Sequence, residues 1–471
     1  MDATAVLSDV GQLWKADIVP TLHDYIAIPN LSPAFDADWA ANGHMTRAVD
    51  LVAGWCRARQ IEGMTVEVAE LPGRTPLIVI EVPAFGPGRD EDPVLLYGHL
   101  DKQPEMHGWR EGLGPWTPVL EGDRLYGRGG ADDGYAAFAS LAAIEAVQRA
   151  GGAHARCLVL VEASEESGSL DLPAHLEALS ERIGTPSLVV CLDSGCNDYD
   201  RLWVTTSLRG LAGGTLTVDI LEEGVHSGSA SVVVPSTFRI ARQLLERIEE
   251  AGTGEIRLRP LHVVIPEDRR RQAEETAATT PAYAERYRFV PGAGPVMEDP
   301  VEQILAHTWR PTLSVVGADG LPATSRAGNV LRPSTSLLLS FRLPPTCDAE
   351  AALAAVSAAL TADPPYGARV SFSGREAGPG WNAPAFAPWL DAALERASQA
   401  AFGAPARAFG EGGTIPFTGM LGQRFPEAQF VITGVLGPDS NAHGPNEYLH
   451  LPTGERLTGA LAMVLDDHTR R

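Results

Sequence analysis

The sequence predicts an α/β fold, in which a mainly parallel sheet carries helices on both faces and a smaller α+β domain is inserted. Apolar runs at 94–97, 157–161 and 187–192 alternate with helical patterns, which is typical of parallel strands buried on both faces. After about residue 216 the strands alternate apolar and polar side chains, as half-exposed antiparallel strands do. A chain of 471 residues is too long for one simple core, so at least two domains are expected.

The first part of the chain is expected to alternate between helices and strands. Apolar residues at helical spacing predict helices over 4–28 and 38–59, the second with Asp38 as its N-cap. The further expected elements are helices over 135–149 and 170–182 and strands over 64–68, 77–82, 94–97, 157–161 and 187–192. Active sites of such sheets lie beyond the carboxyl ends of the strands, so polar residues just after a strand are candidates.

The order of elements after residue 206 indicates an inserted domain. Strands are expected over 216–220, 313–316, 335–343 and 369–372, helices over 235–250 and 350–360, and a charged surface helix or loop over 267–280. This strand–helix–strand–strand–helix–strand order is typical of a ferredoxin-like α+β domain. A helix over 387–401 and a strand over 429–433 return the chain to the first domain. The predicted domains are 1–206 together with 377–471, and 207–376.

The composition argues against several classes of protein. Lys+Arg 37 against Asp+Glu 60 gives a formal net charge of −23, which disfavours binding to nucleic acids and to anionic membranes. No apolar run approaches the roughly 20 residues of a membrane span, and the first residues lack the pattern of a signal peptide. The five cysteines are scattered, which is typical of reduced thiols. We therefore expect a cytoplasmic protein.

His99 and Asp101 are the first candidates for a metal site. They follow the strand over 94–97, and alternate residues of an extended segment point the same way. Asp101 could accept the N–H of one ring nitrogen of His99 and leave the other nitrogen for a metal ion. Taken alone, the tripeptide also fits a buried histidine whose hydrogen bonds are satisfied.

Asp132 follows a turn with three glycines in four residues, Gly127 to Gly130. Glycines let the backbone fold tightly, so a short carboxylate can bridge two metal ions about 3.5–4 Å apart. The alternative is a turn aspartate that caps the helix beginning near Asp133. Asp133 itself fits a cap or a support of the turn better than a ligand.

Glu165 and Glu166 follow the strand over 157–161 as adjacent carboxylates, which repel each other unless cations lie nearby. Adjacent side chains diverge, so Glu166 could bind a metal ion while Glu165 faces a bound water as general base. A solvated acidic loop is the other interpretation.

Asp193 and His443 could complete the site, the first from the end of a strand and the second from the segment 441–447. The candidate ligands are His99, Asp132, Glu166, Asp193 and His443. Nitrogen and oxygen ligands without sulfur suit Zn²⁺, Mn²⁺ or Co²⁺. We expect two divalent ions, with Zn²⁺ as the first expectation and Mn²⁺ or Co²⁺ as alternatives.

Six motifs occur in the order found in one protein family. They are Gly98-His99-Leu100-Asp101, Gly127-Arg128-Gly129-Gly130-Ala131-Asp132-Asp133, Glu165-Glu166-Ser167-Gly168, Val225-His226-Ser227-Gly228, Gly412-Gly413-Thr414-Ile415-Pro416 and Ala442-His443-Gly444. With them the chain resembles the M20 family of metallopeptidases over about residues 10 to 465, and most of all its carnosinase-like cytosolic dipeptidases. The motifs are very specific for the family and much less so for the substrate.

The resemblance implies a role for each candidate residue. One ion would lie on His99, Asp132 and Asp193, and the other on Asp132, Glu166 and His443. Asp101 would orient His99, Glu165 would be the proton shuttle, and the Asp132–Asp133 peptide bond would be cis. Aspartate rather than glutamate at position 193 favours dipeptidases and aminopeptidases over carboxypeptidases and aminoacylases.

The resemblance also implies a role for the inserted domain, as the lid and dimerisation domain of a homodimer. His226 would reach the active site of the partner subunit and polarise the scissile carbonyl. The residues at the family's substrate contacts are Asn329, Arg342, Gly413 and Thr414, and Arg342 suits a carboxylate terminus.

Two departures from the family pattern lie close to the motifs. After Asp133 the family usually has Lys-Gly, where this chain has Gly134-Tyr135. Before Gly412 it usually has Arg-Glu, where this chain has Gly410-Glu411. The missing positive charges leave the candidate ligands intact and bear on the choice of substrate.

The expected function is hydrolysis of an amide bond in a dipeptide or small peptide-like substrate, with Glu165 as general base. One alternative keeps the site but changes the reaction, to deacylation of an N-acyl amino acid. A second alternative is a catalytically silent dimer that binds metal or peptide, which the missing lysine and arginine would permit.

Overall fold

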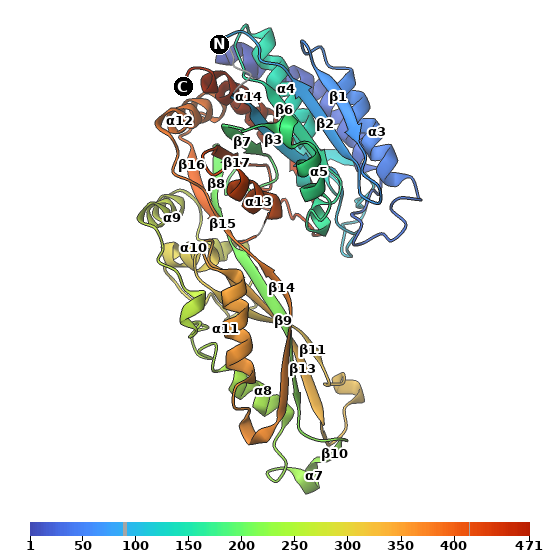
Figure 1. Cartoon of the computed structure of the whole chain (residues 1–471), viewed down its shortest axis with the longest axis vertical. Coiled ribbons are helices and arrows are strands. Elements are labelled where there is room, and N and C mark those ends of the chain that lie inside the picture. The colour runs from blue at the N-terminus through green and yellow to red at the C-terminus, as the bar shows by residue number, and fades with distance from the viewer. Residues whose placement is uncertain (88–91, 414) are drawn as a thin grey trace. The chain divides into compact units, whose positions relative to one another are not determined.

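The computed structural model describes residues 1–87, 92–413 and 415–471, and contacts divide them into two compact units (Figure 1). Unit 1 comprises Met1–Thr205, Ala383–Phe409 and Met420–Arg471, and unit 2 comprises Thr206–Asn382 and Gly410–Gly419. The sequence-based division places 410–419 in the first domain. In the structure this segment groups with unit 2, because Arg209 donates its main-chain N–H to Gly413 O (3.1 Å) and its Nε to Gly412 O (3.2 Å).

Unit 1 is built on a twisted sheet whose central strands are parallel. Its strands are β1 (Thr65–Ala69), β2 (Leu77–Val82), β3 (Val94–His99), β6 (Cys157–Glu162), β7 (Leu188–Cys191) and β17 (Gln429–Ile432). Strands β8 (Trp203–Leu208) and β16 (Arg407–Glu411) begin in unit 1, and their last residues belong to unit 2. The order is β1-β2-β6-β3-β7-β17-β8, with β16 beside β8. Strands β6, β3, β7 and β17 are mutually parallel, whereas β1, β2 and β8 add antiparallel edges. The predicted mainly parallel sheet is confirmed.

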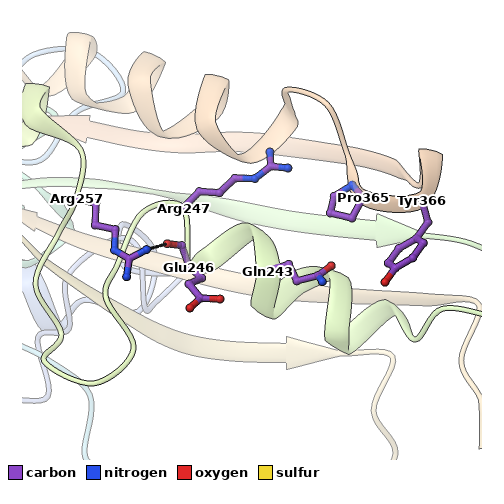
Figure 2. A pocket seen from close by; sticks show the side chains of 6 residues that line it. All are labelled: Gln243, Glu246, Arg247, Arg257, Pro365 and Tyr366. Carbon is purple, nitrogen blue, oxygen red and sulfur yellow. Dashed lines mark hydrogen bonds between the residues drawn. The ribbon is translucent and has the colours of Figure 1, made fainter. Parts of the chain in front are cut away.

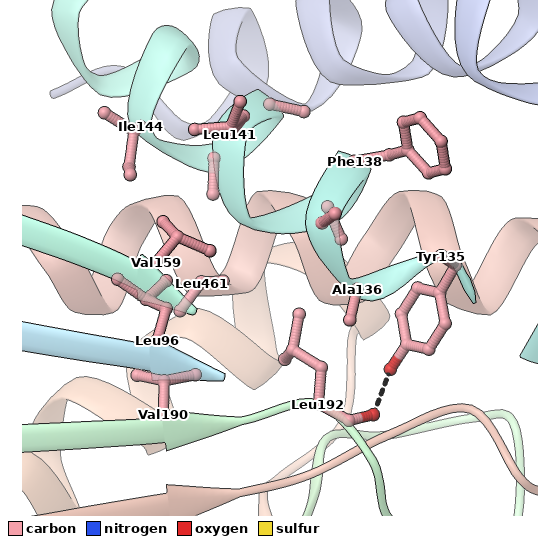
Figure 3. Close-up of a cluster of buried hydrophobic side chains, with 14 of the residues drawn as sticks. Leu96, Tyr135, Ala136, Phe138, Leu141, Ile144, Val159, Val190, Leu192 and Leu461 are labelled. Atoms are coloured by element: carbon pink, nitrogen blue, oxygen red, sulfur yellow. Dashed lines mark hydrogen bonds between the residues drawn. The ribbon is translucent and has the colours of Figure 1, made fainter. Parts of the chain in front are cut away.

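Most helices of unit 1 bury apolar residues in one core together with this sheet. The helices of this unit are α1 (Ala3–Leu13), a π-helical turn (Trp14–Ile18), α2 (Val19–Ile26), α3 (His44–Arg57), α4 (Ala136–Arg149), α5 (Leu172–Ala178), α6 (Ser180–Ile183), α12 (Pro388–Phe402) and α14 (Leu451–His468). Leu96, Val159 and Val190 of three neighbouring strands face Leu141 of α4 and Leu461 of α14 (Figure 3). The many alanines of α4 let it pack closely, and the helix is buried nearly all round.

The helix predicted to begin at Asp38 is wrong at its start, since α3 begins at His44 with Gly43 as its N-cap. The preceding segment forms turns instead. Asp36 accepts the main-chain N–H of Asp38 (3.0 Å) and the side-chain amide of Asn42 (2.5 Å), so polar side chains stabilise turns at the expense of a helix. The helix predicted over 170–182 is likewise interrupted, and forms α5 and α6.

A small three-stranded sheet joins two segments that are far apart in the sequence. It consists of β4 (Val119–Glu121), β5 (Arg124–Tyr126) and β18 (Tyr448–His450), in the order β18-β5-β4. Tyr448 pairs with Tyr126. The glycine turn after β5 therefore lies beside the segment that precedes β18, and this brings Asp132 and His443 into one region.

Unit 2 has a four-stranded antiparallel sheet in the order β11-β13-β9-β14. Its strands are β9 (Gly210–Asp219), β11 (Thr312–Asp319), β13 (Ser334–Leu343) and β14 (Arg369–Gly378), with α8 (Thr237–Leu245) and α11 (Ala349–Thr361) packed on it. The smaller elements are β10 (Val225–His226), α7 (Ser227–Ala230), α9 (Glu267–Thr279), α10 (Pro300–Thr308), β12 (Val330–Leu331) and β15 (Trp381–Asn382). This arrangement is the predicted ferredoxin-like α+β fold. Helix α13 (Pro416–Arg424) follows in the chain.

Two predictions from composition can be compared with the structure. Within the described ranges, no helix has the length and apolar character that crossing a membrane requires. The five cysteines all lie in these ranges, are buried, and form no disulfide bond.

Candidate metal centre

The first candidate residues lie at or just after the carboxyl ends of three neighbouring parallel strands. Strand β3 ends at His99, β6 ends three residues before Glu165, and β7 ends two residues before Asp193. Because the strand order is β6-β3-β7, these side chains start from one edge of the sheet.

His99, Asp132 and Asp193 form one group of potential ligands, all buried. His99 Nε2 lies 3.5 Å from Asp132 Oδ1 and 3.8 Å from Asp193 Oδ2. These separations are too long for hydrogen bonds, and Nε2 is a buried atom without a hydrogen-bond partner. A cation between the three side chains would satisfy this nitrogen.

Asp132, Glu166 and His443 form a second group. His443 Nε2 lies 2.9 Å from Asp132 Oδ2 and 3.3 Å from Glu166 Oε2. Asp132 thus presents one carboxylate oxygen to each group. This is the arrangement that a carboxylate bridging two cations requires.

The turn that carries Asp132 depends on glycine. Gly127 and Gly129 have φ values of +143° and +79°, which disfavour any residue with a side chain. The Asp132–Asp133 peptide bond is cis, as the resemblance implied. Asp133 accepts the main-chain N–H of His99 (3.3 Å) and so ties the turn to the end of β3.

Asp101 connects the histidine to the glutamate pair. The ring Nδ1 of His99 lies 3.1 Å from the main-chain oxygen of Asp101 and 3.6 Å from its carboxylate. The carboxylate accepts the main-chain N–H groups of Glu165 (3.1 Å) and Glu166 (3.0 Å). Asp101 therefore fixes the ring of His99 through its carbonyl and the glutamate pair through its side chain. The second contact was not foreseen from the sequence.

The electrostatics of the site favour positive charge. Burial alone would lower the pKa of His99, but the carboxylates of Asp193, Asp101 and Asp132 raise it well above its usual value. Partial burial opposes the charged form of His443, whose side chain is 55% exposed, yet hydrogen bonds to Asp132 and Glu166 raise its pKa to about 11.

Two carboxyl groups of the site, those of Glu165 and Asp193, have raised pKa values, which also indicates that the site lacks positive charge. Burial raises the pKa of Glu165 well above its usual value, and the charge of Asp193 adds to this. Burial raises the pKa of Asp193 to about 6, although His99 opposes the shift. A cluster that stabilises protonated histidines and carboxyls also attracts divalent cations. The unpaired ring nitrogen and the nitrogen and oxygen donors therefore fit a metal site.

The departure at Gly134-Tyr135 has a local explanation. A Cβ atom at Gly134 would lie 2.2 Å from the ring of Tyr25, so no side chain fits at this position. Tyr135 is fully buried and donates its hydroxyl to Leu192 O (2.5 Å), directly before Asp193. Tyr135 thus holds the carbonyl next to a candidate ligand, a contact that sequence reasoning missed.

A buried lysine lies beside the same ring. The ammonium group of Lys102 donates to the main-chain oxygens of Tyr25 and Ile28 (2.8 Å each) and lies 4.0 Å from the centre of the Tyr25 ring. Burial lowers the pKa of Lys102 well below its usual value. The hydroxyl of Tyr25 donates to Leu100 O (2.6 Å), so this network supports the segment that carries His99.

The departure at Gly410 is also explained by packing. A Cβ atom there would lie 2.6 Å from Ser207 Oγ and 3.0 Å from Thr308 Cβ. An arginine could not occupy this position without moving its neighbours.

The remaining predicted residues lie in unit 2 or outside the described ranges. His226 is exposed in β10, and Ser227 donates its main-chain N–H to the oxygen of the exposed Asn329 (2.9 Å). Arg342 is half-buried on β13, and Gly413 accepts from Arg209. Thr414 lies outside the described residues.

A groove of about 600 Å³ on unit 2 is a separate feature (Figure 2). It is lined by Gln243, Glu246, Arg247, Arg257, Pro365 and Tyr366. Both arginines donate to main-chain carbonyls, Arg257 to Glu246 O (3.0 Å) and Arg247 to Asp363 O (2.9 Å). None of the predicted site residues lines this groove, so it takes no part in the candidate centre.

Comparisons with known proteins bear on the family to which the chain belongs. The model of the peptidase family M20/M25/M40 matches residues 95–467. A cysteinylglycine-S-conjugate dipeptidase of Corynebacterium striatum is 30% identical over 373 residues, which are 77% of this chain and 78% of the relative. A Cys-Gly metallodipeptidase of Schizosaccharomyces pombe is 25% identical over 472 residues, 94% of each chain.

Among solved structures, human carnosine dipeptidase 1 has the same fold. It superposes with a TM-score of 0.75 at 19% identity and covers 99% of both chains. The family match extends over well more than half of the sequence and includes all five candidate ligands. The chain therefore belongs to the peptidase family M20/M25/M40 and is an M20-type metallopeptidase.

Proposed function

We propose that the protein hydrolyses the amide bond of dipeptides or small peptide-like substrates with two divalent metal ions. The observation that carries the proposal is the placement of Asp132, whose two carboxylate oxygens face two separate groups of ligands. The dipeptidase relatives support the substrate class.

The two groups of side chains indicate which residues would bind each ion. His99, Asp132 and Asp193 would hold one ion, and Asp132, Glu166 and His443 the other. All the donors are nitrogen or oxygen, and Zn²⁺ is the first expectation, with Mn²⁺ or Co²⁺ as alternatives. Bound ions would lower the pKa of a water molecule and polarise the scissile carbonyl.

Glu165 is the proposed general base. Its main-chain N–H is held by Asp101, and its carboxyl group has a raised pKa, so it is suited to accepting a proton. Glu165 takes the proton of the attacking water and delivers it to the leaving amine. Asp101 keeps Glu165 and Glu166 at fixed positions while this proton moves.

The proposed substrate contacts come from unit 2. The exposed His226 of a partner subunit would donate to the oxyanion of the tetrahedral intermediate. Arg342 would bind the carboxylate terminus of the substrate, and Asn329, Gly413 and Thr414 would line its path. This assignment requires a homodimer through unit 2, and His226→Ala should lower kcat without changing metal content.

Glu165→Gln is the direct test of the base. The variant should keep its metal content and lose turnover by roughly 100-fold or more, because a positioned general base contributes about 10²–10⁴-fold. Glu162→Gln is a matched control, since Glu162 is a buried carboxyl three residues away that hydroxyl groups bind. Turnover of Glu165→Gln near the wild-type rate would remove Glu165 as base.

A substrate panel tests the reaction. Metal-free protein reloaded with Zn²⁺, Mn²⁺ or Co²⁺ should hydrolyse free dipeptides faster than acetyl- or succinyl-amino acids. Faster turnover of the acylated amino acids would favour a deacylase. Tight metal binding without hydrolysis of any substrate would contradict the proposal.

A further inference from the structure

The position of His443 is not explained by packing of its own side chain, which is 55% exposed. Its backbone has φ +62°, and Asn441 and Asn446 nearby have φ +55° and +62°. Such left-handed conformations are unfavourable for residues other than glycine and persist only where the surroundings enforce them. Other groups must therefore hold this loop.

Arg128 is the side chain that reaches the loop from the glycine turn. It is 1% exposed, forms an ion pair with Glu447, and donates Nη2 to Gly444 O (3.0 Å), directly after His443. Its Nε donates to Pro104 O (3.3 Å). One guanidinium group thus connects the segment after Asp101 to the loop that carries His443.

Glu447 completes the connection in the opposite direction. It is fully buried, and its Oε1 accepts the main-chain N–H of Gly129 (2.8 Å). Its main-chain oxygen accepts the N–H of Gly127 (3.0 Å). The turn that presents Asp132 and the loop that presents His443 are therefore joined by one buried ion pair and its hydrogen bonds.

We propose that Arg128 and Glu447 are positioning residues that set His443 against Asp132, and so determine the affinity of the metal position formed by Asp132, Glu166 and His443. This inference rests on the proposed dimetal function. Arg128 and Glu447 belong to neither group of candidate ligands, and in this proposal they act through the two segments they join.

Breaking the buried ion pair of Arg128 and Glu447 should have a measurable effect on one of the two metal affinities. Removing one partner leaves a buried charge uncompensated and frees the loop to relax. Loss of a group that orients a metal ligand typically weakens metal binding about 10–100-fold. The group formed by His99, Asp132 and Asp193 shares Asp132 with the second group but includes no residue of the loop that carries His443, so its affinity should fall less.

The experiment measures Zn²⁺ binding by equilibrium dialysis and chelator competition on the full chain. Wild-type protein should bind two ions. Arg128→Met should bind one ion with near wild-type affinity and the second at least 10-fold more weakly. Arg128→Lys keeps the charge but cannot span to Gly444 O, so it should restore part of the affinity. Glu447→Gln carries the same test where Arg128→Met does not fold.

A double-mutant cycle separates positioning from general destabilisation. His443→Ala removes the ligand itself, so adding Arg128→Met to it should weaken the second ion no further. Arg156→Met is the matched control. Arg156 also joins a carboxylate, Glu81 (3.0 Å), to a main-chain carbonyl, Arg182 O (2.8 Å), elsewhere in unit 1. It should lower stability and leave both affinities unchanged.

The possible results of these binding measurements bear separately on the positioning role and on the dimetal function. Two unchanged affinities in folded Arg128→Met or Glu447→Gln would overturn the positioning role. Additive losses in Arg128→Met and His443→Ala would also overturn it. A wild-type chain that binds fewer than two ions would overturn the dimetal function itself, and this inference with it.

Discussion

At the scale of single residues, the sequence predicts which side chains belong to the candidate site. It does not predict the hydrogen bonds that hold these side chains in position. His99, Glu166 and Asp193 could be predicted because each lies at or soon after the end of an apolar strand, where a parallel sheet exposes its carboxyl edge. The two main-chain hydrogen bonds to the carboxylate of Asp101 could not, because they join segments 64 and 65 residues apart.

Tyr135 illustrates how a departure from a family pattern becomes informative once its contacts are known. Tyr135→Phe should weaken the metal position of His99, Asp132 and Asp193, because it removes the hydroxyl that holds Leu192 O. The free energy of unfolding should fall by about 1 kcal/mol, as for an ordinary hydrogen bond. Chelator competition and urea unfolding measure the two effects.

Ser398→Ala is the control, since Ser398 also donates a buried hydroxyl to a main-chain carbonyl, that of Ala404 (2.7 Å), and accepts the N–H of Leu202 (3.1 Å). It should reduce stability at least as much and leave metal affinity unchanged. Equal metal affinity in wild type and Tyr135→Phe would show that the tyrosine only packs.

The raised pKa of Glu162 predicts that the stability of the protein depends on pH. Burial raises its pKa from 4.5 to about 7, and the charge of Asp101 adds to this against the hydroxyl groups of Tyr97 and Ser169. The folded state thus favours the protonated carboxyl, so its stabilising contribution is complete below pH 4.5 and is lost as the pH rises through about 7.

Glu162→Gln cannot ionise and should lack this dependence. From pH 5 to pH 8 the stability of the wild type should fall relative to the variant by roughly 2–3 kcal/mol. Urea unfolding at several pH values measures the difference. A difference that is constant over this range would contradict a raised pKa.

At the scale of helices and strands, periodic apolar patterns predicted most elements. They failed where local polar contacts, or pairing with a distant segment, determine the secondary structure. The turns around Asp36 displace the expected start of α3. Strand β18 has three residues and is defined by its pairing with β5, which lies more than 300 residues earlier in the chain. Neither a three-residue strand nor such a pairing can be recognised from spacing alone.

The turn after Asp133 allows a test at this scale. Gly134→Ala should destabilise the protein by about 1–3 kcal/mol, because the added Cβ would lie 2.2 Å from Tyr25 Cε1 and 2.5 Å from Gly129 O. Gly54→Ala in α3 meets no atom within 4 Å and should instead stabilise by up to about 1 kcal/mol. Urea unfolding of both variants measures the contrast, and equal stabilities would contradict it.

At the scale of the whole molecule, all five candidate ligands belong to unit 1. Calorimetry should therefore resolve a transition that depends on metal and one that does not. Removing divalent ions with EDTA should lower the unfolding temperature of unit 1 only, because a ligand stabilises the unit that binds it, by about 3–4 kcal/mol at 100–1,000 times its Kd.

Asp348→Ala identifies the other transition. Asp348 caps α11 in unit 2 by accepting the N–H of Ala351 (3.0 Å), and its loss should cost about 1 kcal/mol there. A shift of both transitions by EDTA to the same extent would show that metal binding is not confined to unit 1.

The grouping of Gly410–Gly419 with unit 2 limits how this protein can be divided. The chain passes between the units after residues 205, 382, 409 and 419, so neither unit is a single stretch of sequence. A gene fragment that encodes only 206–382 would omit the two carbonyls to which Arg209 donates. Separate expression of unit 2 would require residues 410–419 to be joined to that fragment through a new linker.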